Sequence, residues 1–288
     1  MSSSLMDSNR SMMELPPHVS PVWRFVHPSS ADGVPASVRR RRAVSRYEHF
    51  AQEFGIPLHF EEGVDRLMWL DDERSLESYL PTDSIWWTDR LRRFPEDPGL
   101  FTPPNPAACL DRAAAILQEL GLAHAEHELG IDGIDISLGA TSGPVGEPVQ
   151  TALTCRFGTE LDGIPVIGPG AKTYLTFVEN ADDLGVPQLV ELLSFWRQVE
   201  RGEEIPLIAP ETAVAKALGD LRFHDLDASV PRDVLRAMLT YYAPGPHRLA
   251  SELKPKYAVQ IRVGIAGETG NSIALPRTTW VYVDAAES

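Results

Sequence analysis

Two strand-like runs enclose three residues of this chain whose side chains could do chemistry. The segment is TALTCRFGTELDGIPVIGPGAKTYLTFV, residues 151–178, and it contains Glu160, Lys172 and Tyr174. A carboxylate, an ammonium and a phenol are groups that can move a proton or stabilise a developing charge. These three residues are therefore the first candidates for a catalytic site.

The glycines between the two runs also suggest a phosphate-binding loop. A P-loop needs a strand, then GxxxxGK followed by Ser or Thr, and then a helix. Here Ala171 separates Gly170 from Lys172, and the sequence after Lys172 alternates like a strand. The nucleotide-binding interpretation therefore fails. We expect residues 160–172 to be a long loop between two strands of an antiparallel hairpin.

The alternation within the strand patterns gathers polar side chains on one face. Arg156, Lys172 and Tyr174 belong to this face, and Gln260 and Arg262 alternate with apolar residues in a later strand pattern. One-sided antiparallel sheets expose such faces to solvent. A cationic and phenolic face could also hold an acidic ligand or a peptide, so both interpretations stay open.

Two residue pairs add further candidates. Trp86 and Trp87 could stack on a ligand or plug a gap between subdomains. Asp132 and Asp135 could act as paired carboxylates, although Gly-Asp sequences are most often turns. We include Trp86 and Trp87 among the ligand-binding candidates.

We expect neither a metal nor a cofactor. The chain contains no HExxH, GxSxG or CxxC, and no GxGxxG between a strand and a helix. His124 and His127 could share a helix face but have no evident third ligand. Cys109 and Cys155 are expected to be buried, reduced thiols.

The composition limits the classes of partner. The 288 residues include 26 Lys+Arg and 41 Asp+Glu, and the net charge of −15 disfavours binding to nucleic acid. The arginines of residues 38–46 are expected to start a solvated helix that ends at Gly55 and docks weakly on the acidic body. We see no signal peptide and no apolar run long enough to span a membrane, so we expect a cytoplasmic protein without a membrane partner.

A helix-then-sheet pattern occurs twice along the chain. Asn105-Pro106 and Pro210-Glu211 each open a helical pattern, and β-rich sequence follows each of them. This order predicts an α+β fold with two packed halves, each a helix against an antiparallel sheet. The expected divisions are a mobile arm (1–38), an N-terminal α/β subdomain (39–104), a first helix–sheet half (105–205) and a second half (206–288).

The phrase Leu161-Asp162-Gly163-Ile164-Pro165-Val166, with Gly168-Pro169-Gly170-Ala171 after it, resembles the PepSY and FTP propeptide-like modules. The resemblance covers about residues 105–285 and includes 194–197, 239–244 and 254–257. It implies a cystatin-like helix against a curved antiparallel sheet, often in tandem. It also implies inhibitory, chaperoning or regulatory binding.

Two functions of different classes remain. The first is a binding or regulatory protein that holds a peptide, a protein or an acidic small molecule on a sheet face or edge. The alternative is a cofactor-independent cyclase or isomerase of a natural-product or modified-peptide pathway. Such an enzyme needs only a shaped cavity and one or two acid–base groups, so the absence of motifs does not exclude it.

Overall fold

The computed structural model describes an α+β protein that consists mostly of sheet. The described residues are 19–25, 36–56, 60–63, 65–82, 84–93, 104–122, 128–139, 149–180, 183, 185–197, 199–220, 223, 232–245, 248, 250–264 and 277–287. The chain divides into two compact units. Unit 1 comprises Met1–Arg24, Glu200–Tyr242 and Glu252–Ser288, and unit 2 comprises Phe25–Val199 and Ala243–Ser251.

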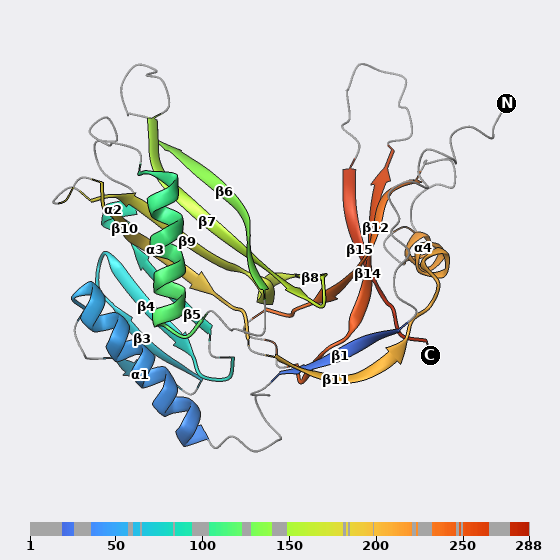
Figure 1. The fold of residues 1–288 in the computed structure, drawn as a ribbon, viewed down its shortest axis with the longest axis horizontal. Coiled ribbons are helices and arrows are strands. Elements are labelled where there is room, and N and C mark those ends of the chain that lie inside the picture. Colours follow the sequence, from blue (N-terminus) through green and yellow to red (C-terminus); the bar gives the residue numbers. More distant parts are fainter. Residues whose placement is uncertain are drawn as a thin grey trace. The chain divides into compact units, whose positions relative to one another are not determined.

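Unit 2 is built on an antiparallel sheet (Figure 1). Strand β7 pairs with β6 on one side, and with β9 and then β8 on the other. From β9 the sheet continues through β10, β5, β4 and β3 to β2. The strands are β2 (Glu61–Glu62), β3 (Arg66–Leu70), β4 (Arg74–Tyr79), β5 (Ser84–Asp89), β6 (Glu128–Gly139), β7 (Val149–Leu161), β8 (Ile164–Ile167), β9 (Thr173–Glu179) and β10 (Pro187–Ser194).

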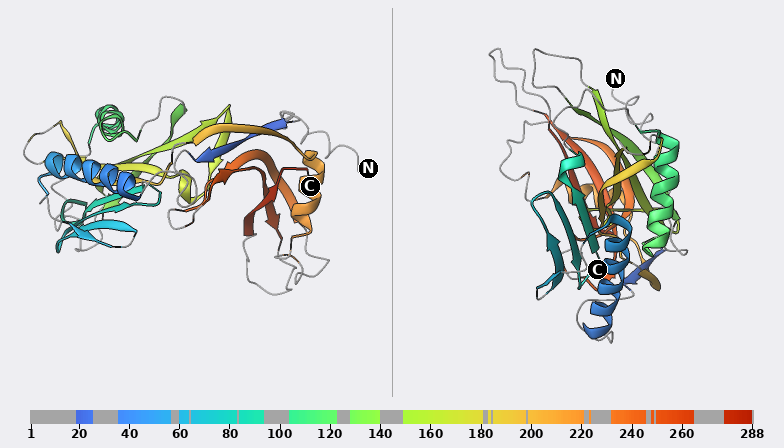
Figure 2. Two further views of the ribbon diagram at one scale, coloured as in Figure 1. Left: turned by 90° about the horizontal axis from the view of Figure 1, so that it is seen from below. Right: turned by 90° about the vertical axis from the view of Figure 1, so that its left-hand side faces the viewer.

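Helices α1 (Ala36–Phe54) and α3 (Pro106–Glu119) cover one face of this sheet (Figures 1 and 2). Both contribute to one hydrophobic core with β3, β4, β5, β7, β9 and β10. Asn105 starts α3 as predicted, because its side chain accepts hydrogen bonds from the backbone N–H groups of Ala107 and Ala108. The two helices fall in different subdomains of the sequence-based division, which remains a prediction, and they share this core.

The basic helix α1 differs from the expected weakly docked segment. Tyr47, Phe50 and Ala51 are fully buried in the core of unit 2, so burial of apolar surface holds the helix in place. The expectation of weak, salt-dependent docking is therefore wrong. Among the arginines, Arg40 makes an exposed ion pair with Glu62 of β2 at 2.6 Å, and salt screens such a pair. The helix ends before Gly55, as predicted.

The described residues of unit 1 form two groups of paired strands and one helix. A three-stranded sheet has the order β11 (Val199–Pro206), β1 (Val19–Phe25), β13 (Glu252–Leu253). An antiparallel sheet joins β12 (Arg232–Tyr242), β14 (Pro255–Val263) and β15 (Arg277–Asp284). Helix α4 (Pro210–Leu218) begins where Pro210 predicted it and packs against that second sheet.

Strand β1 corrects the predicted mobile arm of residues 1–38. Residues 19–25 are a strand whose Trp23 lies opposite Leu253. The hydroxyl of Tyr241, a fully buried residue, donates to the carbonyl oxygen of Pro21 at 2.8 Å. This part of the predicted arm is therefore an integral element of unit 1. Residues 1–18 lie outside the described residues.

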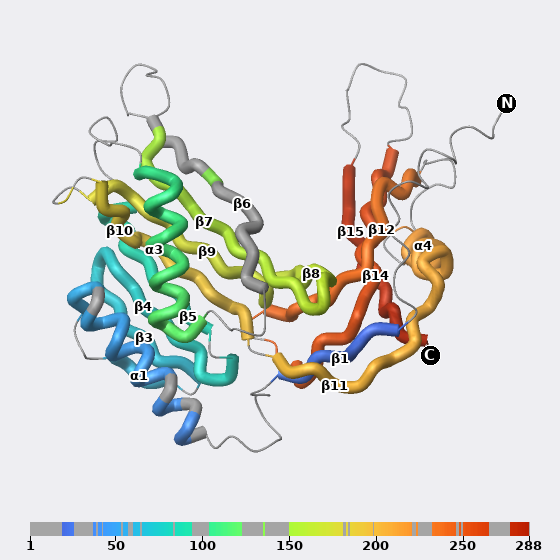
Figure 3. Tube along the Cα trace, in the orientation of Figure 1, coloured from blue at the N-terminus to red at the C-terminus, as the bar shows by residue number. Residues whose placement is uncertain are grey.

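The segment predicted as one long loop contains additional structure. The flanking runs are the antiparallel strands β7 and β9, so the hairpin prediction is confirmed. However, β7 continues to Leu161 and turns at Asp162 and Gly163, which have φ values of 52° and 73°. β8 then pairs back on the end of β7 (Figure 3). A short 3₁₀ turn, η3 (Pro169–Ala171), leads into β9. Two central residues with positive φ are the pattern of tight hairpin turns that match the strand twist.

Among the described residues, no helix has both the length and the apolar character needed to cross a membrane.

Candidate functional site

The side of the unit 2 sheet that faces away from α1 and α3 carries the best candidate site. Leu153, Cys155 and Leu175 point into the core with the helices, so the alternate residues of β7 and β9 lie on the opposite side. We call that side the outer face. The outer face includes Glu77, Trp86, Thr88, Thr154, Arg156, Tyr174, Thr176, Glu191 and Leu193.

One row of the outer face crosses five strands. The strand register places Arg156 opposite Tyr174, Tyr174 opposite Leu193, Leu193 opposite Trp86, and Trp86 opposite Glu77. Directly opposite residues of an antiparallel pair share a face and touch. Leu193 is buried, whereas Trp86 is 37% exposed. The row therefore has an apolar and aromatic centre with a charged residue at each end.

The neighbouring row is polar and largely buried. The hydroxyl of Thr176 donates to Glu191 Oε2 at 3.3 Å, and the Thr154 and Thr176 hydroxyl oxygens are 2.9 Å apart. Since Thr176 uses its single proton toward Glu191, Thr154 is the donor in the second bond. Glu191 is only 5% exposed, and Arg93 of α2 (Arg90–Arg93) pairs with it at 2.5 Å. The buried carboxylate thus has both a cation and a hydroxyl partner.

Tyr174 belongs to the first row, but charged residues of and beside the second row affect its pKa. Burial raises the pKa of its hydroxyl, the negative charge of Glu191 raises it further, and the positive charge of Arg93 acts in the opposite direction. The phenol is therefore protonated at neutral pH. It can donate a hydrogen bond or a proton, and it is a poor general base.

Two of the three cations expected to attract an acidic ligand, Arg156 and Arg262, already have acidic partners. Arg156 Nε lies 2.8 Å from Asp135 Oδ2, and Arg262 pairs with Asp233 at 2.8 Å. Asp135 stands in strand β6, not in the turn that its sequence suggested. Gln260 and Arg262 belong to β14 of unit 1, in a different unit from Arg156. An acidic ligand would have to compete with these carboxylates.

Within the described part of the chain, the three candidate catalytic residues make no hydrogen bond or ion pair with one another. Glu160 is opposite Pro165 in β8. Tyr174 is opposite Arg156, and Glu160 lies four residues farther along β7, which is about 13 Å of strand. Lys172 is exposed in the turn before β9. The register therefore separates Glu160 from Tyr174.

The adjacent tryptophans point to opposite faces of β5. Trp87 is 1% exposed, and its ring packs 5.3 Å from Phe50 and 5.8 Å from Phe54 of α1. It belongs to the core of unit 2 and does not reach the outer face, so we remove it from the ligand-binding candidates. Trp86 remains as the exposed member. Neighbouring strand residues always alternate in this way, so the sequence itself contained the signal.

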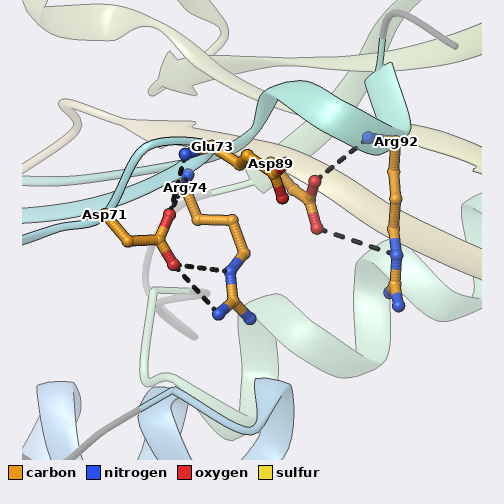
Figure 4. Close-up of polar contacts among 5 residues, drawn as sticks. All are labelled: Asp71, Glu73, Arg74, Asp89 and Arg92. Carbon is orange, nitrogen blue, oxygen red and sulfur yellow. Dashed lines mark hydrogen bonds and ion pairs between the residues drawn. The ribbon is translucent and has the colours of Figure 1, made fainter. Parts of the chain in front are cut away.

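Acidic residues near the ends of β3 and β5 have structural partners. Asp71 accepts hydrogen bonds from the backbone N–H groups of Glu73 and Arg74 and from the Arg74 guanidinium (Figure 4). Asp89 accepts from the backbone N–H of Arg92 at 3.1 Å and thereby caps α2 (Figure 4). These carboxylates close turns and have little capacity left for a ligand.

No group of three or more His, Cys, Asp or Glu side chains within the described ranges could hold a metal ion. The predicted weak candidates His124 and His127 lie outside those ranges. Cys109 and Cys155 are free and buried, as expected. A depression between α1 and α3, lined by Phe50, Phe54 and Ile116 among others, has room for about one water molecule and for no larger ligand.

Comparisons with known proteins give little beyond this geometry. No protein-family model matches the chain, and no curated protein matches it. A solved structure of an uncharacterized protein from Eubacterium rectale is similar, with 12% sequence identity and a TM-score of 0.48. The match covers 96% of this chain and 86% of that one.

Proposed function

We propose that this protein is a binding module that holds a peptide, or an extended segment of a protein, against the outer face of unit 2. The observation that carries the proposal is the row of Tyr174, Leu193 and Trp86 on three neighbouring strands. An exposed tryptophan beside a buried leucine and a half-buried tyrosine is typical of the anchor residues of interfaces. Neighbouring strands lie about 4.8 Å apart, so the row spans about 10 Å.

The charges at the ends of the row favour a peptide over an acidic small molecule. Arg156 is paired with Asp135 at one end, and Glu77 is paired with Arg66 at 3.2 Å at the other. A balanced polar rim around an apolar centre is the usual composition of a protein–protein interface. A site for a small acid would need an unpaired cation, which this row lacks among its described residues. An acidic small molecule is therefore a less favoured ligand of this face than a peptide.

The wider biological setting is part of the same proposal. A chaperoning or regulatory role through PepSY-like halves follows from the sequence resemblance, and a cytoplasmic location is a separate part of the proposal. The role is supported by the packing of α3 and α4, each against an antiparallel sheet. A helix on a sheet is common to many α+β folds, so the binding assay below is the deciding test.

The alternative is a cofactor-independent cyclase or isomerase, and one observation favours it. Tyr174 presents a protonated phenol next to the buried Glu191–Arg93 pair, and a phenol in such a place can act as a general acid. The substitution Tyr174→Phe separates the two functions. It keeps the ring and removes the proton, so it should abolish turnover but leave peptide affinity within about threefold of wild type.

The experiment for the binding proposal uses peptides selected on the wild-type protein from a random display library. Calorimetry with such a peptide should show at least a tenfold loss of affinity in Trp86→Ala, as expected for an interface anchor. Tyr282→Ala is the matched control, because Tyr282 is 40% exposed on β15 of unit 1. Equal affinities of Trp86→Ala and wild type for every selected peptide would refute the proposed surface.

A further inference from the structure

Arg197, three residues beyond the end of β10, is a buried cation in unit 2. The residue is only 6% exposed. Neither of its terminal guanidinium nitrogens has a hydrogen-bond partner among the described residues, and both are closed to solvent. Each of these nitrogens carries two N–H donors. Leaving charged donors unpaired in the interior of a protein is strongly unfavourable, so this arrangement requires an explanation.

The other buried charged residues in the described part of the chain have partners of opposite charge. Asp89 and Glu191, which are 6% and 5% exposed, both have an arginine within ion-pair distance. Each also accepts a further hydrogen bond. Where this protein buries a carboxylate, it supplies a cation and a donor. Arg197 is the exception, since no carboxylate of the described residues lies within ion-pair distance of it.

The contact that Arg197 does make leaves its donors unused. The central carbon of the guanidinium lies 3.6 Å from the centre of the Phe25 ring, so the cation sits over the ring face and gains a cation–π attraction. The N–H groups lie in the plane of the guanidinium, and the two terminal nitrogens have no acceptor among the described residues. The fork of two parallel donors is the geometry that binds a carboxylate or phosphate through two oxygens.

Backbone hydrogen bonds hold Phe25 and the chain just before Arg197. The N–H of Phe25 donates to the carbonyl oxygen of Ser251 at 3.0 Å, and the N–H of Phe195 donates to that of Lys172 at 2.9 Å. Burial lowers the pKa of the guanidinium to about 10, so Arg197 is still positively charged at neutral pH. The cation is thus permanent and held in place.

We propose that Arg197 is the receptor of a small oxyanion site, in which its two terminal nitrogens bind two oxygens of a carboxylate or a phosphate. The site is separate from the Trp86 row and does not depend on the peptide-binding proposal. Because the nitrogens are closed to solvent, the anion enters by a local opening of the surrounding chain. Binding is therefore slower than diffusion allows.

The test measures thermal unfolding of the full chain in increasing sodium phosphate or sodium acetate, against sodium chloride at equal ionic strength. We expect a saturable rise in Tm with at least one oxyanion, of roughly 3 °C at a tenfold excess over Kd. A larger response to phosphate assigns the site to phosphoryl groups, and a larger response to acetate assigns it to carboxylates.

Arg197→Met should remove the response, and its Tm without anion should be no lower than that of wild type, since an unpaired buried charge is removed. Arg262→Met is the control, because Arg262 is exposed and already paired with Asp233; it should respond like wild type. Arg197→Lys keeps the charge without the fork and should weaken binding at least tenfold.

Two results would overturn the site. One is a wild-type protein that shows no saturable response to either oxyanion, which is decisive even if the variants fail to fold. The other is an equal response in Arg197→Met and wild type, since the anion would then bind elsewhere.

Discussion

Two glycines near the β7–β9 hairpin are constrained for different physical reasons. Gly163 has a φ of 73° and open space around it, whereas a Cβ on Gly170 would lie 2.0 Å from the carbonyl oxygen of Pro244. Gly163→Ala should therefore cost about 1 kcal/mol through its backbone angle. Gly170→Ala should cost more, because backbone atoms must move apart.

Urea unfolding of both variants checks this ranking, with Gly219→Ala as the control. Gly219 has an ordinary φ of −87°, and a Cβ there would be 3.6 Å from its nearest neighbour. The control should stay close to wild type. A Gly170→Ala protein as stable as the control would show that the close approach to Pro244 is not maintained.

The two buried thiols give a pH prediction at the same scale. Burial raises the pKa of Cys109 to about 12 and that of Cys155 to about 11, from an ordinary value of 9.0. Both thiols are neutral in either state below pH 9, so their contribution to stability is complete there. Above pH 9 the unfolded chain ionises its thiols first, and stability falls as the pH rises toward 11 and 12.

Thiol reactivity and alkaline unfolding measure this effect. A thiol-specific disulfide reagent at pH 8 should label neither cysteine in the folded protein and both in urea. Cys155→Ala should lose less stability between pH 9 and 11 than wild type. Rapid labelling of the native protein would contradict the burial of these residues.

Single residues also show what the sequence could and could not predict. The opposite orientations of Trp86 and Trp87 follow from strand alternation alone. The pairing of Arg156 with Asp135 does not, because it depends on the register of β6 against β7. Local patterns determine which way a side chain points, whereas its partner depends on a contact between distant segments.

At the scale of elements, one ion pair joins the single-turn helix α2 to strand β10. Arg93 pairs with Glu191, whose side chain is 6% exposed. Arg93→Met leaves this carboxylate buried without a cation, and we expect a loss of about 2–3 kcal/mol. Arg40→Met is the control. Arg40 lies 2.6 Å from Glu62, and both side chains are nearly half exposed, so its loss should stay within about 0.5 kcal/mol.

Chemical denaturation of the two variants and of Arg93→Met/Glu191→Leu provides the measurement. The double variant should regain much of the lost stability, because the unpaired charge is gone and an apolar side chain of similar size fills the site. Equal losses in Arg93→Met and Arg40→Met would mean that the Glu191 pair is exposed to water and contributes little.

The elements that the sequence predicted are those with local signals. Helices α3 and α4 begin at the expected prolines, and β7 and β9 coincide with the two alternating runs. Strand β1 was missed because its Pro-containing sequence resembles a linker and its partner β13 is more than 200 residues away. Strand β8 was missed because its residues are mixed with turn-forming glycines and prolines. On the outer face, Arg156, Tyr174 and Trp86 were all candidates, but Glu191 and Arg93 were not.

At the scale of the whole molecule, the chain passes repeatedly between the two units. Unit 1 draws on segments before Phe25, from Glu200 to Tyr242, and after Ser251. The predicted division at 205/206 would cut β11 and remove β1 from unit 1. We expect a fragment of residues 206–288 to lack cooperative thermal unfolding, because Tyr241 would lose its bonds to Ser20 and Pro21.

Calorimetry of the fragment beside the full chain decides this point. A cooperative transition in the isolated 206–288 fragment would show that the second half folds alone and would support the sequence-based division. Its absence would show that unit 1 needs residues from both ends of the chain.

The exposure of Trp86 also makes it a natural optical probe. The chain has six tryptophans. Trp23, Trp69, Trp87 and Trp196 are each at most 8% exposed, and Trp86 is 37% exposed. A collisional quencher such as acrylamide therefore reaches Trp86 far more readily than these four. A ligand that covers the outer face should shield this fraction of the emission, so binding can be followed by fluorescence without any label.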